Sequence, residues 1–364
     1  MSRRDDRIAQ LGKVMADAGV EVYLAASPVT MNYFHGYAEA SGERFLVMAI
    51  RNTGEIRLIA PSLAENQARR SGLSDVRLWS DGQDPMAHFA ELVKDWNLGG
   101  AKAAVDDDMY ASKLLDMQNT AGSLSYIHGH PIRAQLMSRK DAGELELMHR
   151  AGQIADEAYL AAIAQVKEGM TEHDLEKIFF AEMSARGGQP TFSIMGFGAN
   201  GAEPHHHNDG TQLKKGDVMI MDFGCLYGGY NSDVTRTASF GQPDPEAFKV
   251  YEVVLAAHMN AVEHIKPGVS FESVDGMARQ TIADAGYGKF FTHRLGHGVG
   301  MNIHEKPDVV AGEKLPMSPG HCFSIEPGIY LEGRFGVRIE NLYTCQEGGA
   351  VSFNAAPPAA LTVI

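Results

Sequence analysis

Four carboxylates lie at corresponding places in two similar stretches of the chain, residues 216–237 and 320–345. In each stretch an apolar run leads to the first acid, and a return strand after a turn carries the second. An ionised acid on an apolar strand is costly unless a positive group lies opposite it. Two hairpins that bring four acids to one point therefore indicate a metal site, with the candidate ligands Asp222, Asp233, Glu326 and Glu340.

The first hairpin is expected to turn immediately after its first acid. We expect the strand Val218–Met221 to end at Asp222, and Phe223–Gly224 and Tyr227–Gly229 to turn the chain back. The second stretch has the same spacing, because the first acid of each copy lies six residues after a glycine and is followed by x-Gly. This repetition favours one structural device used twice.

One histidine, His297, lies between the hairpins and is flanked by Gly296 and Gly298, which allow ligands to approach closely. Four carboxylates with one imidazole suit Mn²⁺, Co²⁺, Fe²⁺ or catalytic Zn²⁺ better than structural zinc, which favours thiolates. Calcium loops carry closely spaced Asp and Asn instead. Each acid alone would be interpreted as a solvated hairpin residue. The occurrence of four acids in two similar hairpins, together with His297, argues against that interpretation. Four carboxylates exceed the needs of one ion, so two ions that share bridging acids are the simpler interpretation.

The elements before the hairpins are also duplicated. A long helix from Gly143 through Ile163, a link that ends on Thr171 and an amphipathic helix precede the first hairpin. A helix through residues 250–262, a link that ends on Ser270 and another helix precede the second. Thr171 and Ser270 are credible N-caps. Two related halves that face each other would place the four acids at their shared seam.

The first part of the chain alternates helix and strand patterns and carries nothing that suggests catalysis. We expect a helix that ends at Gly19 and another that begins at Asp84–Pro85. Strands are expected at Val22–Ala25, Phe45–Ile50, Ile56–Ile59, Ala103–Val105 and Ser125–Ile127. The pattern lapses around residues 129–141, which divides the chain into domains 1–132 and 140–364. The expected fold class is α/β followed by α+β.

Length and composition restrict the function. At 364 residues the chain suits two domains, and its 44% hydrophobic and 21% charged residues are globular values. The net charge of −14 argues against nucleic acid or an anionic membrane as a partner. No apolar run approaches the ~18 residues of a membrane span, and no signal peptide is visible. Three unpaired cysteines, Cys225, Cys322 and Cys345, suggest reduced core thiols in a cytoplasm.

One motif is misleading. Residues 196–201 spell GxGxxG after a strand-like run, but a dinucleotide fingerprint must open a helix. Pro204, three histidines and a turn signal follow instead, which argues against nucleotide binding. On composition alone His205, His206 and His207 are exposed loop residues.

The motifs together resemble the pita-bread metallopeptidases: prolidases (Xaa-Pro dipeptidases), aminopeptidase P and methionine aminopeptidases. Residues 32–37 are similar to part of the creatinase-like N-terminal domain of that family. The similarity to the catalytic signature lies in residues 200–206, MDFG at 221–224, NSDVTRT at 231–237, GHGVG at 296–300, HEKP at 304–307, SIEPG at 324–328 and VRIEN at 337–341. It implies a creatinase-like domain followed by a pita-bread domain with pseudo-twofold duplication.

The resemblance also implies roles. It makes the four acids and His297 the ligands of two divalent ions, Mn²⁺ first, with Asp233 and Glu340 bridging. His205 and His304 match histidines that contact the substrate and the developing tetrahedral centre. Glu326 matches the proton acceptor, Arg338 matches an arginine near the site of prolidases, and relatives are usually homodimers.

Three classes of function remain open at this stage. The leading one is a peptidase that cleaves an N-terminal Xaa-Pro bond of dipeptides or short peptides. The second is a metal-dependent hydrolase or lyase of a small non-peptide substrate, of the ectoine hydrolase or dimethylsulfoniopropionate lyase type. The third is a non-enzymatic binding module. Retention of all five ligands argues against the binding module and against a creatinase-type enzyme, which lacks the metal set.

An acid near the site bears on the substrate. Relatives often carry a basic residue after the HExP segment, where this chain has Asp308. An acid there would repel the carboxylate of a dipeptide by ~1–4 kcal/mol at ~4 Å, whereas Arg338 or Lys306 would attract it. A solvent-facing Asp308 is the other interpretation.

Overall fold

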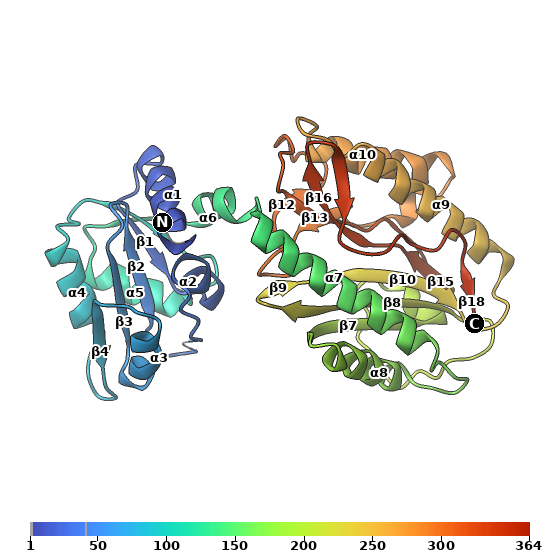
Figure 1. The fold of residues 1–364 in the computed structure, drawn as a ribbon, viewed down its shortest axis with the longest axis horizontal. Helices are drawn as coiled ribbons and strands as arrows, with labels where there is room; N and C mark the ends of the chain where they lie inside the picture. The colour runs from blue at the N-terminus through green and yellow to red at the C-terminus, as the bar shows by residue number, and fades with distance from the viewer. Residues whose placement is uncertain (1–2, 41) are drawn as a thin grey trace. The chain divides into compact units, whose positions relative to one another are not determined.

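The computed structural model describes residues 3–40 and 42–364, and the chain divides into two compact units, Met1–Met137 and Ser138–Ile364 (Figure 1). Figure 1 colours the second unit from green to red. No helix in the described ranges has both the length and the hydropathy of a membrane-spanning segment.

A six-stranded mixed sheet forms the centre of the N-terminal unit. Its strands are β1 (Val22–Ala25), β2 (Val47–Arg51), β3 (Ile56–Pro61), β4 (Val76–Trp79), β5 (Lys102–Val105) and β6 (Ser125–His128). Their spatial order is β4-β3-β2-β1-β5-β6, with β2 antiparallel to both β1 and β3 and all other neighbours parallel. All five expected strands are therefore confirmed, and β4 is an additional one.

Helices pack on this sheet and bury an apolar core. They are α1 (Arg3–Asp17), α2 (Pro28–His35), η1 (Ser62–Ala64), α3 (Glu65–Arg70), α4 (Met86–Asp95), α5 (Ala111–Thr120) and α6 (His130–Met137). The helix expected to begin at Asp84–Pro85 is confirmed as α4, and its Phe89 and Leu92 are buried in the core. Helix α6 forms where the sequence pattern lapses, so the first unit extends to Met137.

Two sheets and a ribbon form the C-terminal unit. The first sheet contains β7 (Gln189–Phe197), β8 (Val218–Tyr227), β9 (Tyr230–Asn231), β10 (Val234–Ser239) and β18 (Thr362–Val363), in the order β18-β10-β8-β7 with β9 against β8. The second contains β11 (Gly296–Gly298), β12 (Glu305–Val309), β13 (Cys322–Ile325), β16 (Asn341–Gln346) and β17 (Gly349–Ser352), in the order β12-β11-β13-β16-β17. β14 (Gly328–Leu331) and β15 (Phe335–Arg338) form the ribbon.

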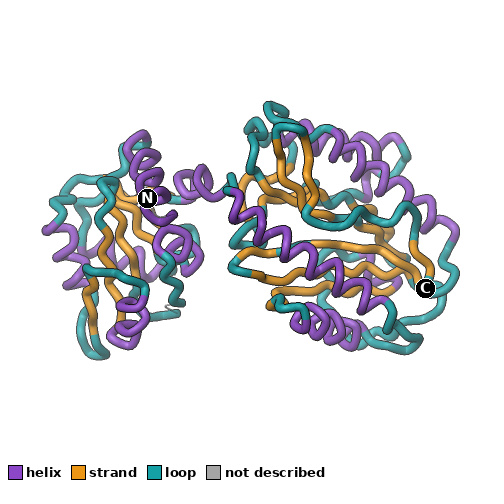
Figure 2. The backbone as a smooth tube through the Cα atoms, in the orientation of Figure 1, coloured by secondary structure: helices purple, strands orange, loops and turns teal. Residues whose placement is uncertain are grey.

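Each sheet is covered by its own helix pair, which confirms the duplicated architecture (Figure 2). The pairs are α7 (Ala142–Ile163) with α8 (Glu172–Ala185), and α9 (Pro245–Glu263) with α10 (Phe271–Asp284). Thr171 caps α8 by accepting a hydrogen bond from the Asp174 amide, and Ser270 caps α10 by accepting one from the Ser273 amide. Both predicted N-caps are confirmed, and each fixes where the second helix of its half begins.

The first acidic hairpin turns later than expected. Strand β8 continues through Asp222 and Gly224 to Tyr227, and only residues 228–229 form the turn. The expected strand end at Asp222 is wrong. Gly224 serves close packing instead, because a Cβ atom there would lie 2.2 Å from the Ser232 carbonyl oxygen. Asp222 therefore lies within a long strand, opposite Thr235 of β10.

The second acidic hairpin is interrupted at its acids. Ile325 pairs with Asn341 on one side and Gly328 pairs with Arg338 on the other, in one continuous antiparallel register. Glu326 and Glu340 lie in the gap between these two ladders. The hairpin expected from the sequence is therefore present, and both of its acids stand where the regular backbone pairing stops.

Candidate active site

A cavity of about 410 Å³ lies in the C-terminal unit, and its walls include every residue that the sequence nominates for chemistry. Those residues come from both halves of the duplicated fold, namely His205, Asp222, Asp233, His297, His304, Glu326, Arg338 and Glu340. The fold thus gathers residues more than 130 positions apart in the chain into one site.

Two of the acids each leave one buried oxygen without a partner. The Arg338 Nη2 atom donates to Asp222 Oδ2 at 2.7 Å, and the Thr235 hydroxyl donates to Glu340 Oε2 at 2.7 Å. The other oxygens, Asp222 Oδ1 and Glu340 Oε1, are buried and accept no hydrogen bond from any group of residues 3–40 or 42–364. A buried acceptor without a partner is unfavourable. These two oxygens are therefore suited to a cation.

The imidazole of His297 is oriented as a ligand. Its Nδ1 atom lies 3.0 Å from the Gly298 carbonyl oxygen and donates to it, so Nε2 carries the lone pair. That Nε2 atom lies 3.5 Å from Asp233 Oδ2 and 3.4 Å from Glu326 Oε1. Burial, followed by the nearby His304, lowers the pKa of His297 to about 3, which keeps the ring neutral. A neutral ring is the form that binds a metal.

The acids repel one another when they are ionised. Burial, followed by Glu340 and Asp222, raises the pKa of Asp233 well above its ordinary value. Burial, followed by Glu326, does the same to the pKa of Glu340, and burial raises the pKa of Glu326 to about 7. Arg338 is paired with Asp222 and offsets one charge, so four ionised carboxylates at neutral pH require further positive charge among them. The donor set therefore fits divalent cations.

The two predicted histidines outside the ligand set face the same cavity. His304 lies edge-on to His297, with 4.1 Å between the ring centroids, and burial lowers its pKa. His205 also lines the cavity and lies in the loop between η2 (Gly198–Ala202) and β8. Composition suggested that all three consecutive histidines are exposed; His205 and His207 are, but His206 is buried, so the expectation is wrong for His206.

Sequence reasoning missed three polar residues of the site. His293 and Arg294 line the cavity, and the Tyr330 hydroxyl lies 2.8 Å from His293 Nε2 and accepts from Arg338 Nη1 at 3.0 Å. His293 stands four residues before His297, and that spacing was the one available signal. Burial lowers the pKa of His293 to about 4.

Asp308 does not simply face solvent. Its carboxylate accepts a hydrogen bond from Arg294 Nη1 at 2.9 Å and also pairs with Lys306. Arg294 lines the cavity, whereas Asp308 does not. Two cations offset the Asp308 charge, so the simple repulsion considered from the sequence is incomplete.

A second group with ligand chemistry, formed by Glu172, His206 and Asp209, is already saturated. Both Glu172 oxygens accept hydrogen bonds, from the backbone amides of Phe197 and Asp209 and from the side chains of Asn200 and His206. With every acceptor facing an N–H group, no lone pair is left for an ion.

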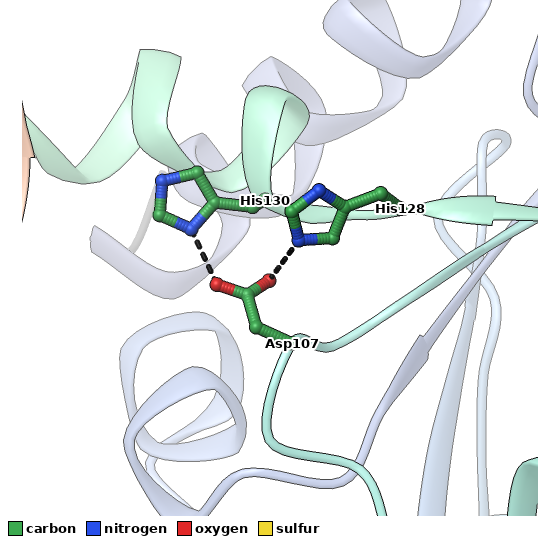
Figure 3. Close-up of side chains that lie close together, drawn as sticks. All are labelled: Asp107, His128 and His130. Atoms are coloured by element: carbon green, nitrogen blue, oxygen red, sulfur yellow. Dashed lines mark hydrogen bonds and ion pairs between the residues drawn. The ribbon is translucent and has the colours of Figure 1, made fainter. Parts of the chain in front are cut away.

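A third such group lies in the N-terminal unit and contains Asp107, His128 and His130 (Figure 3). Figure 3 shows both histidine rings directed at the two oxygens of Asp107. Arg133 Nη2 also donates to Asp107, at 3.0 Å, and lies 3.4 Å from His130 Nδ1. This guanidinium already supplies the positive charge, so the group is an ion-pair network.

The misleading motif and the cysteines behave as expected. Residues 198–202 form a short 3₁₀ turn, and no α-helix follows the GxGxxG sequence. Gly196 is needed because a Cβ atom there would lie 2.8 Å from Gly201 Cα. Cys225, Cys322 and Cys345 are free and buried, and none of them lines the cavity.

Comparison with known families gives two matches that together span most of the chain. The sequence model of metallopeptidase family M24 matches residues 146–347. The model of the creatinase/prolidase N-terminal domain matches residues 7–135.

Individual relatives are similar along nearly their whole length. The probable dipeptidase PepE of Mycobacterium tuberculosis is 35% identical over 359 residues, which cover 96% of this chain and 94% of the relative. The Xaa-Pro dipeptidase of Lactobacillus delbrueckii subsp. lactis is 31% identical over 362 residues, covering 93% and 94%. The crystal structure of a prolidase from Thermococcus sibiricus superposes with a TM-score of 0.95 at 34% identity and covers 100% of both chains.

Proposed function

The chain belongs to metallopeptidase family M24, and we propose that it cleaves the Xaa-Pro bond at the N-terminus of dipeptides or short peptides. It is a metal-dependent peptidase, and within that class we propose a site for two divalent ions. Mn²⁺ is the first choice, with Co²⁺, Zn²⁺ and Fe²⁺ as alternatives. The proposed ligands are Asp222, Asp233, His297, Glu326 and Glu340. The observation that carries the proposal is the unpartnered, buried oxygens of Asp222 and Glu340 in the cavity that His297 also lines, where ligand atoms of Asp233, His297 and Glu340 lie within 4.8 Å of one another.

The chemistry is divided between ions and side chains. Divalent ions in this site would lower the pKa of a water molecule to about 7 and polarise the scissile carbonyl group. His205 and His304 donate hydrogen bonds to the carbonyl oxygen as negative charge develops on it. Glu326 accepts the proton of the attacking water, since its side chain is 16% exposed, against 6% for Asp233. Arg338 holds Asp222 in place through its 2.7 Å contact.

The cavity offers surfaces that suit a short Xaa-Pro substrate. Phe192, Ile194 and Ile303 line it beside the acids and provide an apolar wall for a prolyl ring. Arg294 lines the cavity with a side chain that is 35% exposed, and we assign it to the carboxylate of a dipeptide. Its pairing with Asp308 then sets how much of its charge is available to that carboxylate.

The same proposal places the protein in the cytoplasm as a homodimer. Three free, buried cysteines agree with a reducing compartment. The molar mass in solution, measured by light scattering, tests the oligomeric part. A mass of one chain would contradict it.

Substrate comparison tests the proposed activity. The value of kcat/KM is measured for Ala-Pro, Ala-Ala, a longer Xaa-Pro peptide and a small non-peptide substrate such as the cyclic amidine ectoine, with Mn²⁺ and after chelation. We expect metal-dependent hydrolysis of the Xaa-Pro substrates to exceed that of Ala-Ala by ~10-fold or more, as expected when a pocket is matched to one side chain. Turnover confined to the small non-peptide substrate would assign the protein to the non-peptide class.

A further inference from the structure

The ring of His205 is not held by any hydrogen bond. Within residues 3–40 and 42–364 no group donates to it or accepts from it, although the ring lines the cavity. Its position therefore depends on the backbone that carries it. A catalytic hydrogen bond tolerates little displacement, and an error of ~1 Å costs ~10²-fold in rate.

Both neighbours of His205 are anchored. The Pro204 carbonyl oxygen accepts a hydrogen bond from Arg338 Nη1 at 3.3 Å. On the other side the His206 ring is buried, and its Nε2 atom donates to Glu172 Oε2 at 2.7 Å. His205 thus lies between an anchor on β15 and an anchor on α8.

The carboxylate of Glu172 accepts four hydrogen bonds from the segment that contains His205. Its Oε1 atom accepts from the Phe197 amide at 2.9 Å and from Asn200 Nδ2 at 3.0 Å. Its Oε2 atom accepts from the Asp209 amide at 2.9 Å, in addition to His206. The four donors flank His205 in the sequence on both sides.

The location of Glu172 makes this carboxylate a rigid support. It is the first residue of α8 and is fully buried. The N-terminus of a helix stabilises a negative charge, and four N–H donors replace the water that burial removes. Such fully satisfied buried networks have few alternative arrangements.

From these contacts we propose that Glu172 and His206 form a positioning clamp that holds His205 against the substrate. The clamp acts through His205, and its effect on turnover rests on the proposed catalytic role of that residue. His206 is accordingly a positioning residue, neither a metal ligand nor a contact of the substrate. This assigns separate tasks to three consecutive histidines: His205 lines the cavity, His206 positions His205, and the exposed His207 does not line the cavity.

Kinetics of the holoenzyme give the first test. His206→Ala should lower kcat for an Xaa-Pro substrate about 10- to 100-fold and leave the metal content at the wild-type value. His206→Gln should recover most of kcat, because its amide nitrogen reaches Glu172 from a similar distance. His207→Ala is the matched control and should change kcat less than about twofold. Equal loss in His206→Ala and His206→Gln would overturn the clamp.

A double-mutant cycle distinguishes positioning from a direct role. In a His205→Ala background, the change His206→Ala should cause less than about a threefold further loss. A full additional 10- to 100-fold loss would show that His206 acts independently of His205, and would contradict the proposal. If His205→Ala itself keeps wild-type turnover, the catalytic assignment of His205 fails, and with it the functional part of the clamp.

Amide hydrogen exchange tests the clamp without reference to activity. The amides of residues 198–210 should exchange faster in His206→Ala than in the wild type. Their exchange rates should be unchanged in His207→Ala. Glu172→Gln is the second variant, since its NH₂ group must face N–H donors on one side and so breaks two of the four hydrogen bonds. Unaltered exchange of this segment in both clamp variants would refute the clamp whichever substrate the protein cleaves.

Discussion

Replacing Glu326 with Gln should stabilise the metal-free protein at alkaline pH while removing a proposed ligand. Burial raises the pKa of Glu326 to about 7, from 4.5. The folded state holds this proton more tightly than the unfolded state, so folding loses stability as the pH rises from about 4.5 to about 7. At about 1.4 kcal/mol for each pH unit, the folding stability lost through this carboxyl group, relative to strongly acidic pH, is about 1 kcal/mol at pH 5 and about 3 kcal/mol at pH 8.

The measurement compares chelator-treated wild type and Glu326→Gln by thermal unfolding from pH 5 to pH 8. Gln is uncharged throughout, so the difference between the two proteins isolates this carboxyl group from the buried histidines that titrate in the same range. The advantage of the variant should grow by about 2 kcal/mol, or about 4–8 °C in Tm for a unit of this size. Glu263→Gln, at an exposed position on α9, is the control and should show no such trend.

Saturating Mn²⁺ should reverse the order, because ions that bind the folded state stabilise it and the wild type binds them more tightly. A Tm difference that is constant from pH 5 to pH 8 would refute the argument that burial and neighbouring acids destabilise ionised Glu326. In that case the electrostatic basis for the metal site would be wrong.

Three further changes test other parts of the site. Asp233→Asn should lose the full occupancy of both proposed ions, because the family resemblance implies that Asp233 is a ligand of each; full metal content by elemental analysis would remove Asp233 from the set. His304→Ala should keep its metal and lose ~10²-fold or more in kcat, because a transition-state hydrogen bond is lost; near-wild-type turnover would make His304 structural. Asp308→Ala should free Arg294 and raise the preference for an Xaa-Pro dipeptide over its C-terminal amide, measured as a ratio of kcat/KM values; an unchanged ratio would exclude Asp308 from specificity.

Local patterns were predictable because their causes are local. Thr171 and Ser270 cap helices through contacts within three residues, and the periodic apolar residues of each helix face one core. The turn of the first hairpin was predicted wrongly because Gly224 looks like a turn residue. It is a glycine because the Ser232 carbonyl lies close to it, which no local pattern reveals.

Some residues of the candidate site could likewise be predicted from the sequence, and others could not. The four acids stand out in the sequence because an apolar run leads to a carboxylate twice, each time six residues after a glycine and followed by x-Gly. The catalytic roles of His205, His304 and Arg338 came only from the family resemblance. The partners that hold the site, such as Glu172 and Tyr330, are contacts between distant segments. A single sequence gives no signal for such pairs.

Titration of metal-free protein with Mn²⁺ tests the central claim most directly. Bound metal and Xaa-Pro hydrolysis are followed together as the ion is added. The four acids and His297 predict that hydrolysis rises until two ions are bound per chain and then stays constant. Full activity with one ion per chain, or activity that persists in the metal-free protein, would contradict the proposed centre.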